Sequence, residues 1–228
     1  MSRLFPERAS VTLAPDRVTI GNRSIACDPQ FGQQPWQGAI AALQTIEWQS
    51  RSLVTAVLSN HFVRYLLVPW SDAVRGEAEE EAYLRHHFRK IHGDRANEWT
   101  LRSSEAPRGS PRLASAIDSA LLEALKASFP KGGKALLVSV QPALMAAFNR
   151  HRGAIPASGA WLALAESDRA CVALHASDGW RAVQNGKGAW LALLERERHR
   201  IDGEVPELVL LDGARPPQDA QGWKFHEL

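Results

Sequence analysis

The chain has 228 residues, of which 45% are hydrophobic and 23% are charged, and its formal net charge is +2. These proportions are those of an ordinary globular protein, and they exclude intrinsic disorder, a fibrous repeat and a low-complexity chain. The balance of 27 basic and 25 acidic residues gives no strong field that would attract nucleic acid or an anionic membrane.

The first 70 residues contain several short apolar runs bounded by turn formers. Pro35 and the spacing of the apolar residues from Trp36 to Ile46 predict a helix. The last two runs flank Asn60-His61 and are mainly apolar, with β-branched and aromatic residues, so we expect them to pair at the centre of a sheet. We expect strands over residues 11–13, 18–20, 24–27, 53–58 and 62–70.

The clearest helix follows, with Ser71 as its N-cap, an end near Ile91 and a stop at Gly93. Its acidic residues come early and its basic residues come late, which suits the helix dipole, and Ile91 belongs to its apolar stripe. The remaining chain contains both strands and helices and ends in a polar, Pro-rich tail. We expect strands over 99–102, 113–117, 135–140, 161–165, 170–175, 180–184 and 208–211, and helices over 119–129, 142–150 and 189–201.

The segment from Phe62 to Phe148 carries the strongest part of a family resemblance. Tyr65–Trp70 leads into an acidic helix, and two strands, a helix and Val138-Ser139-Val140-Gln141-Pro142 follow in order. This order resembles the actin-like cytoplasmic domains of bacterial assembly-platform proteins, namely the L protein of type II secretion and the M-type and MSHA biogenesis proteins of type IV pilus systems. The resemblance implies an α/β, degenerate actin-like (ribonuclease H-like) fold with mixed sheets flanked by helices. Its two lobes would be residues 1–152 and 153–228.

Two turns depart from the pattern of the nucleotide-binding members of this fold. Such proteins hold phosphate on glycine-containing hairpin turns, because backbone N–H groups must approach it closely. The turns here are Ala14-Pro15-Asp16-Arg17 and Glu166-Ser167-Asp168-Arg169, and neither contains glycine. We therefore expect no cofactor and no ATP hydrolysis. The alternative is an actin-like ATPase or kinase relative that holds Mg²⁺-nucleotide with Asp16, Asp168, Asp212 and Gly213.

Other residues that suggest chemistry have simpler structural explanations. His86, His87 and His92 do not have the i,i+3 or i,i+4 spacing of helical metal ligands, so we expect no metal site. Asp118 suits a helix N-cap, and Ser59 with His61 lacks the marks of an activated nucleophile. The sequence Gly186-Lys187-Gly188 lacks the upstream glycine and the following Ser or Thr of a phosphate loop. We expect no catalytic residue.

The chain has eight tryptophans against two tyrosines. Because each tryptophan contributes a large contact area, this excess indicates packing in the core or at an interface with a partner. As partner-binding candidates we select Trp70, Trp161, Trp180 and Trp190, with core packing as the alternative for each.

The two cysteines, Cys27 and Cys171, are not spaced like metal ligands or a redox pair, which fits a reducing cytoplasm. A disulfide between them is the alternative. The N-terminus has no apolar signal region, and no run is apolar enough to insert into a membrane. The resemblance implies a cytoplasmic scaffold at the inner membrane. Its partners would be an inner-membrane assembly-platform protein and the secretion or pilus ATPase. A homodimer and a small-molecule-binding regulatory domain are open alternatives.

Overall fold

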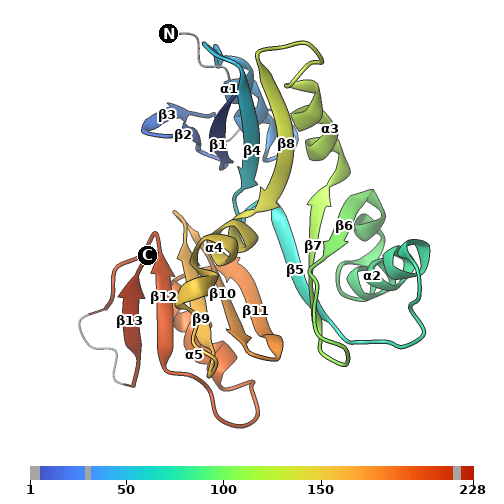
Figure 1. Cartoon of the computed structure of the whole chain (residues 1–228), viewed down its shortest axis with the longest axis vertical. Helices are drawn as coiled ribbons and strands as arrows, with labels where there is room; N and C mark the ends of the chain where they lie inside the picture. Colours follow the sequence, from blue (N-terminus) through green and yellow to red (C-terminus); the bar gives the residue numbers. More distant parts are fainter. Residues whose placement is uncertain (1–5, 29–31, 218–221) are drawn as a thin grey trace. The chain divides into compact units, whose positions relative to one another are not determined.

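The computed structural model describes residues 6–28, 32–217 and 222–228 (Figure 1). The chain forms two compact units, each built from two separate stretches of sequence. The first unit is Met1–Val63 with Ile117–Ala143, and the second is Arg64–Ala116 with Leu144–Leu228. This division into compact units does not test how the chain divides into lobes. The predicted lobes, residues 1–152 and 153–228, therefore stay a prediction.

The first unit is a five-stranded sheet in the order β3-β2-β1-β4-β8 with two helices. Strand β1 pairs antiparallel with β2 and parallel with β4, and β4 pairs parallel with β8. Side chains that alternate to one face, such as Val11, Leu13 and Val54, are fully buried in it. The elements are β1 (Glu7–Leu13), β2 (Arg17–Ile20), β3 (Arg23–Ala26), α1 (Gln37–Gln44), β4 (Ser52–Leu58), α3 (Ser119–Ala127) and β8 (Ala135–Pro142).

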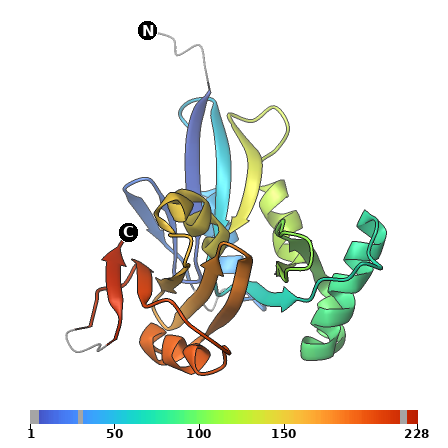
Figure 2. The ribbon, with the colours of Figure 1, turned by 60° about the horizontal axis from the view of Figure 1, so that its bottom comes forward.

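The second unit holds two further sheets, in the orders β5-β7-β6 and β11-β10-β9-β12-β13. Strands β9, β10 and β11 form the predicted antiparallel meander, and β12 joins it in parallel to β9. Figure 2 shows helix α5 on one face of this sheet. The elements of the three-stranded part are β5 (Val63–Val68), α2 (Glu77–His92), η1 (Gly93–Glu98), β6 (Trp99–Ser103) and β7 (Arg112–Asp118). The elements of the other part are α4 (Ala143–His151), η2 (Arg152–Ala154), β9 (Ala160–Ala165), β10 (Arg169–Ala176), β11 (Gly179–Lys187), α5 (Trp190–Arg198), β12 (Leu208–Asp212) and β13 (Lys224–Glu227).

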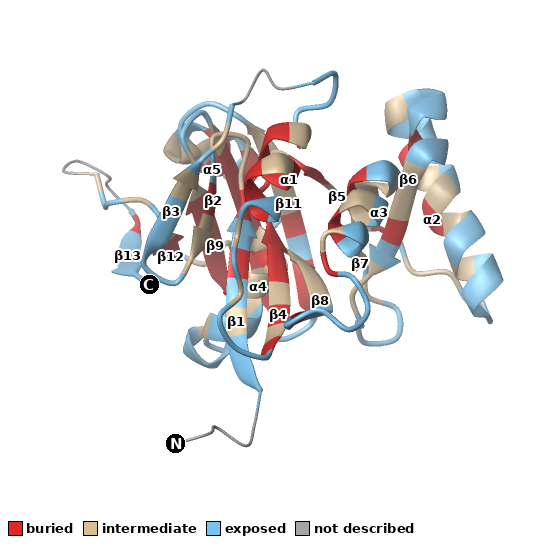
Figure 3. Cartoon of the chain, turned by 90° about the horizontal axis from the view of Figure 1, so that it is seen from above, coloured by how far each residue is buried: buried red, intermediate tan, exposed pale blue. Residues whose placement is uncertain are grey.

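Each part of the second unit has its own core. Around Phe88, which is fully buried, helix α2 packs against β6 and β7. Around Trp161 and Leu194, which are also fully buried, helix α5 packs on the five-stranded sheet (Figure 3). None of the helices in the described ranges is long and apolar enough to cross a lipid bilayer.

Three sequence predictions are wrong. Strands β4 and β5 do not pair, because β4 lies between β1 and β8 whereas β5 belongs to the sheet with β7. Helix α2 begins at Glu77 with Gly76 as its N-cap, and the Ser71 hydroxyl instead accepts a hydrogen bond from the N–H of Ala73 in the preceding turn. The polar tail contains a strand, β13, which pairs in parallel with β12.

Candidate functional site

The first turn that could face a nucleotide, between β1 and β2, is closed by a hydrogen bond from the N–H of Ala14 to the carbonyl of Arg17, at 2.9 Å. Pro15 has no N–H to offer. The carboxylate of Asp16 accepts hydrogen bonds from Arg17, at 3.0 Å from Nε and 2.6 Å from Nη2. This hydrogen bond lowers the pKa of Asp16. Its negative charge is therefore already matched by the neighbouring guanidinium.

The second turn, between β9 and β10, is closed from the N–H of Glu166 to the carbonyl of Arg169 at 2.8 Å. Asp168 contacts the end of β11 through both its side chain and its backbone carbonyl. Its carboxylate lies 3.8 Å from Nζ of Lys187, and its carbonyl accepts the N–H of Gly188 at 3.2 Å. Gly188 and Lys187 thus both contact this turn.

Backbone conformation offers a direct test of whether these turns fit a phosphate. An anion-binding nest needs successive N–H groups in alternating right-handed and left-handed residues. In the described part of the chain, every residue with positive φ is a glycine. Because neither turn contains glycine, neither forms a nest, and the residues of these turns do not fit a nucleotide phosphate.

Asp212 and Gly213 lie at the end of β12, opposite the end of its parallel neighbour β9. They share this end of the sheet with Asp168, whereas Asp16 belongs to the other unit. Gly213 has φ of +74°, and a Cβ there would lie 2.6 Å from the carbonyl oxygen of Ala165. The close approach of two backbones therefore explains this glycine without a ligand.

The three histidines of α2 do not converge. His87 lies against Tyr83, with ring centroids 4.6 Å apart, and His92 lies 5.1 Å from the ring of Trp99. His86 contacts the edge of His87. Among the described residues, no group of three or more His, Cys, Asp or Glu is arranged to hold a metal ion.

Two further sequence candidates have local structural roles. The Ser59 hydroxyl accepts the backbone N–H of His61 at 3.2 Å and lies 2.9 Å from its Nδ1, so both contacts are made within one turn. Asp118 is the N-cap of α3, as predicted, and accepts the N–H of Ala120 at 2.9 Å. Its second oxygen accepts the indole N–H of Trp36 at 3.2 Å.

The four selected tryptophans occupy different environments. Trp161 is 0% exposed and Trp180 is 3% exposed, so a partner cannot reach either one in this conformation. Trp190 packs on the core with its ring centroid 5.7 Å from that of Phe225. Trp70 is half-buried, and the guanidinium carbon of Arg112 lies 5.1 Å from its ring centroid.

A groove of about 450 Å³ in the second unit was not predicted from the sequence. Ile91, which the sequence placed on the apolar stripe of α2, is 58% exposed at its rim. The only signal in the sequence was this residue's position in the last turn before Gly93. The lining residues come from β5, the end of α2, β11 and the end of α5: Arg64–Leu67, Ile91, His92, Arg181–Asn185, Glu197, Arg200 and Ile201.

Comparisons by sequence find nothing, since neither a protein-family model nor a curated protein matches the chain. Comparisons by structure do find similar chains. A Bacteroides thetaiotaomicron protein with an actin-like ATPase fold and unknown function has a TM-score of 0.56 at 10% identity, covering 91% of this chain and 82% of its own. A chain of the PilM–PilN type IV pilus biogenesis complex has a TM-score of 0.62 at 17% identity, with coverages of 90% and 80%.

The third similar structure is the cytoplasmic domain of EpsL, an inner membrane component of the type II secretion system of Vibrio cholerae. It has a TM-score of 0.57 at 15% identity, covering 97% of this chain and 89% of that one. The chain therefore has the α/β, actin-like fold that the order of elements predicted, and the resemblance to these pilus and secretion structures is confirmed.

Proposed function

We propose that this chain is a non-catalytic cytoplasmic scaffold in a pilus or type II secretion-like assembly platform. It would bind the tail of an inner-membrane platform protein or the assembly ATPase, and so be held peripherally at the inner membrane. The observation that supports this most is the fold shared over 90% and 97% of the chain with a chain of the PilM–PilN complex and with the EpsL domain.

The non-catalytic part of the proposal is supported by the two turns. Actin-like enzymes must bring backbone N–H groups to the phosphates, and turns without left-handed residues cannot form the nest that does so. Asp16 and Asp168 are also engaged by Arg17 and Lys187. Both observations favour a role in binding proteins over a role in hydrolysis.

An actin-like ATPase or kinase relative is the second candidate. One observation favours it: Asp168, Asp212 and Gly213 share one end of the five-stranded sheet, where carboxylates could meet Mg²⁺-nucleotide. Titration of the full chain with ATP and Mg²⁺, followed by calorimetry, separates the two candidates. Saturable binding at micromolar concentrations would contradict the scaffold proposal, whereas the scaffold predicts no heat beyond dilution.

The partner is tested by affinity capture of the full chain from a native membrane extract of its own organism. We expect recovery of an inner-membrane platform protein or an assembly ATPase, and recovery of neither contradicts the assignment to such a platform. Trp70→Ala tests a contact residue, because half-buried tryptophan is a typical binding hot spot. Its loss should reduce capture, while gel filtration of the same sample checks the alternative of a homodimer.

A further inference from the structure

Strand β8 lies at one margin of the sheet of the first unit, and its sequence differs from those of the other terminal strands (Figure 1). Natural proteins place charged residues on terminal strands, because these strands carry N–H and C=O groups that would otherwise pair with other chains. Six strands are terminal in the described sheets, and β8 is the one among them without a charged residue. The other five are β3, β5, β6, β11 and β13, which carry Arg23, Arg64, Arg102, Arg181 and Lys224.

Strand β8 also exposes apolar side chains. Leu136 is 55% exposed and Val138 is 52% exposed, and they are two of the four large hydrophobic residues described as exposed. Leu137 between them is half-buried, so the two exposed side chains lie on one face of the sheet. Leu53, the neighbour of Leu136 on β4, is half-buried on that same face. A partner that covered this face at the margin would remove its apolar surface from water.

The backbone of β8 has hydrogen-bonding groups that face away from β4. Ser52 of β4 pairs with Ala135 in the parallel ladder, and the N–H of Ser52 donates to the carbonyl of Lys134 at 2.9 Å. The N–H and C=O of one residue face the same side of a strand, and successive residues alternate between the two sides. The backbone groups of Leu136 therefore face β4, whereas those of Ala135 and Leu137 face the open margin.

An antiparallel pair of two β8 strands centred on Leu137 fits both features. The two copies of Leu137 would exchange two N–H···O=C hydrogen bonds, which uses the groups that face the margin. Leu136 of each copy would lie opposite Val138 of the other copy, on the same face, so each exposed side chain covers the other. The two copies use the same residues and are related by a twofold axis, which closes the assembly at two.

The charges beside β8 agree with a second copy as the occupant. In this register Lys134 lies opposite Val140 and Ala135 lies opposite Ser139, so no like charges meet along the strands. Lys131 and Lys134 are exposed and precede the paired segment, so an antiparallel arrangement places the basic residues of the two copies at opposite ends of it. A second copy therefore matches this margin in charge, in side-chain size and in backbone pattern by its own sequence.

We propose that two copies of this chain associate through β8 as an antiparallel, twofold-symmetric dimer, in which the sheets of the two first units become continuous. The register of β8 against β4 shifts beyond Leu137, and a bulge of this kind bends a strand, so the paired segment is short. The interface is then smaller than a standard one, and the dissociation constant of the dimer should be about 1 to 100 µM. The dimer goes beyond the proposed function and does not depend on it.

The test is sedimentation velocity of the full chain at about 1 to 300 µM, a range that contains the expected dissociation constant. We expect a reversible equilibrium between monomer and dimer. Val138→Lys places a charge opposite Leu136 of the second copy, so it should weaken association at least about tenfold. Ile91→Lys is the matched control, because it makes the same kind of change at a residue that is 58% exposed but lies on α2, and it should leave association unchanged.

Cysteine cross-linking tests the register in a Cys27→Ser background, because Cys27 is only partly buried whereas Cys171 is buried. The variants Leu136→Cys and Val138→Cys should form a disulfide when they are mixed, because opposite residues have Cβ atoms about 4.5–5.5 Å apart. Either variant alone should cross-link more slowly, because its two cysteines would be diagonal neighbours about 7–8 Å apart.

Several results would overturn the dimer proposal. These are the absence of a dimer up to about 300 µM, equal association of the natural chain and Val138→Lys, or growth of the assembly beyond a dimer. Equal rates of cross-linking for the mixture and for the single variants also overturn it, because they contradict the register. A dimer without capture of a platform component contradicts the proposed function alone, and capture by a chain that stays monomeric contradicts the dimer alone.

Discussion

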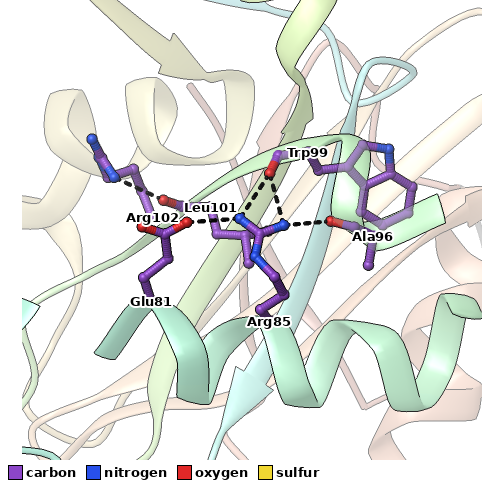
Figure 4. Close-up of polar contacts among 6 residues, drawn as sticks. All are labelled: Glu81, Arg85, Ala96, Trp99, Leu101 and Arg102. Atoms are coloured by element: carbon purple, nitrogen blue, oxygen red, sulfur yellow. Dashed lines mark hydrogen bonds and ion pairs between the residues drawn. The ribbon is translucent and has the colours of Figure 1, made fainter. Parts of the chain in front are cut away.

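Arg85 holds the second unit's three-stranded part together, and its replacement gives the sharpest stability prediction. Its Nη1 donates to the carbonyl of Ala96 at 2.8 Å and to that of Trp99 at 3.3 Å, and its Nη2 lies 2.8 Å from Glu81 (Figure 4). One side chain thus joins α2, the short helix η1 and the start of β6. The side chain of Arg85 is 25% exposed, and Ala96 is fully buried.

The magnitude follows from these contacts. A hydrogen bond from a charged donor to a carbonyl contributes about 1.5 to 3 kcal/mol, and the bond to Ala96 has the length and burial for this range. The longer bonds to Trp99 and the ion pair with Glu81, whose side chain is 58% exposed, add less than about 1 kcal/mol. Arg85→Ala should therefore lower the free energy of unfolding by about 2 to 3 kcal/mol, which corresponds to a Tm lower by about 4 to 12 °C for a chain of this size.

The assay is urea unfolding followed by tryptophan fluorescence and far-UV circular dichroism. Arg89→Ala is the matched control, because it lies one turn further along the same helix and carries the same change in helix propensity. Its ion pair with Asp94 is exposed on both sides, at 55% and 85%, so its loss should cost less than about 1 kcal/mol. Equal destabilisation by the two substitutions would refute the assignment of Arg85 as the residue that joins these elements.

Three further predictions concern stability. Asp118→Ala should cost about 2 kcal/mol by urea unfolding, because it removes the cap of α3 and leaves a buried indole N–H without its acceptor, whereas Asp118→Asn should recover most of this loss. Gly213→Ala should lower the Tm more than Gly203→Ala does. Both glycines have positive φ, but a Cβ at Gly213 would lie 2.6 Å from the carbonyl oxygen of Ala165, whereas a Cβ at Gly203 would meet no atom within 4 Å. Equal losses of Tm would contradict this. Burial lowers the pKa of His175, so the unfolded chain takes up its proton first as the pH falls below about 6.5. Stability present above that pH is then lost on acidification, and His175→Phe should show a smaller decrease in Tm between about pH 7 and about pH 5 than the natural chain.

Local signals in the sequence predicted the elements that depend on neighbouring residues. The hairpin of β1 and β2, the meander and the cap of α3 at Asp118 are all confirmed. Helix α2 begins five residues later than predicted, with Gly76 instead of Ser71 as its N-cap, because Ser71 uses its hydroxyl in a turn that competes with the helix. Strand β13 has no apolar pattern, since three of its four residues are exposed, and it is held by backbone pairing with β12.

Features that depend on distant residues could not be predicted in this way. Two apolar runs separated by a short turn are typical of a hairpin, but β4 and β5 join different sheets, and the choice depends on β1, β8 and β7. The groove has the same origin, because β5 and β11 are separated by more than a hundred residues of sequence. No local pattern identifies such a surface.

The excess of tryptophan has a different meaning after the structure is known. Of the eight tryptophans, four are at most 8% exposed, so much of their contact area is used within the units. Two of the four that the sequence favoured as contacts, Trp161 and Trp180, belong to this buried group. Half of the tryptophans therefore serve packing within the units, so their excess does not by itself indicate a partner-binding surface.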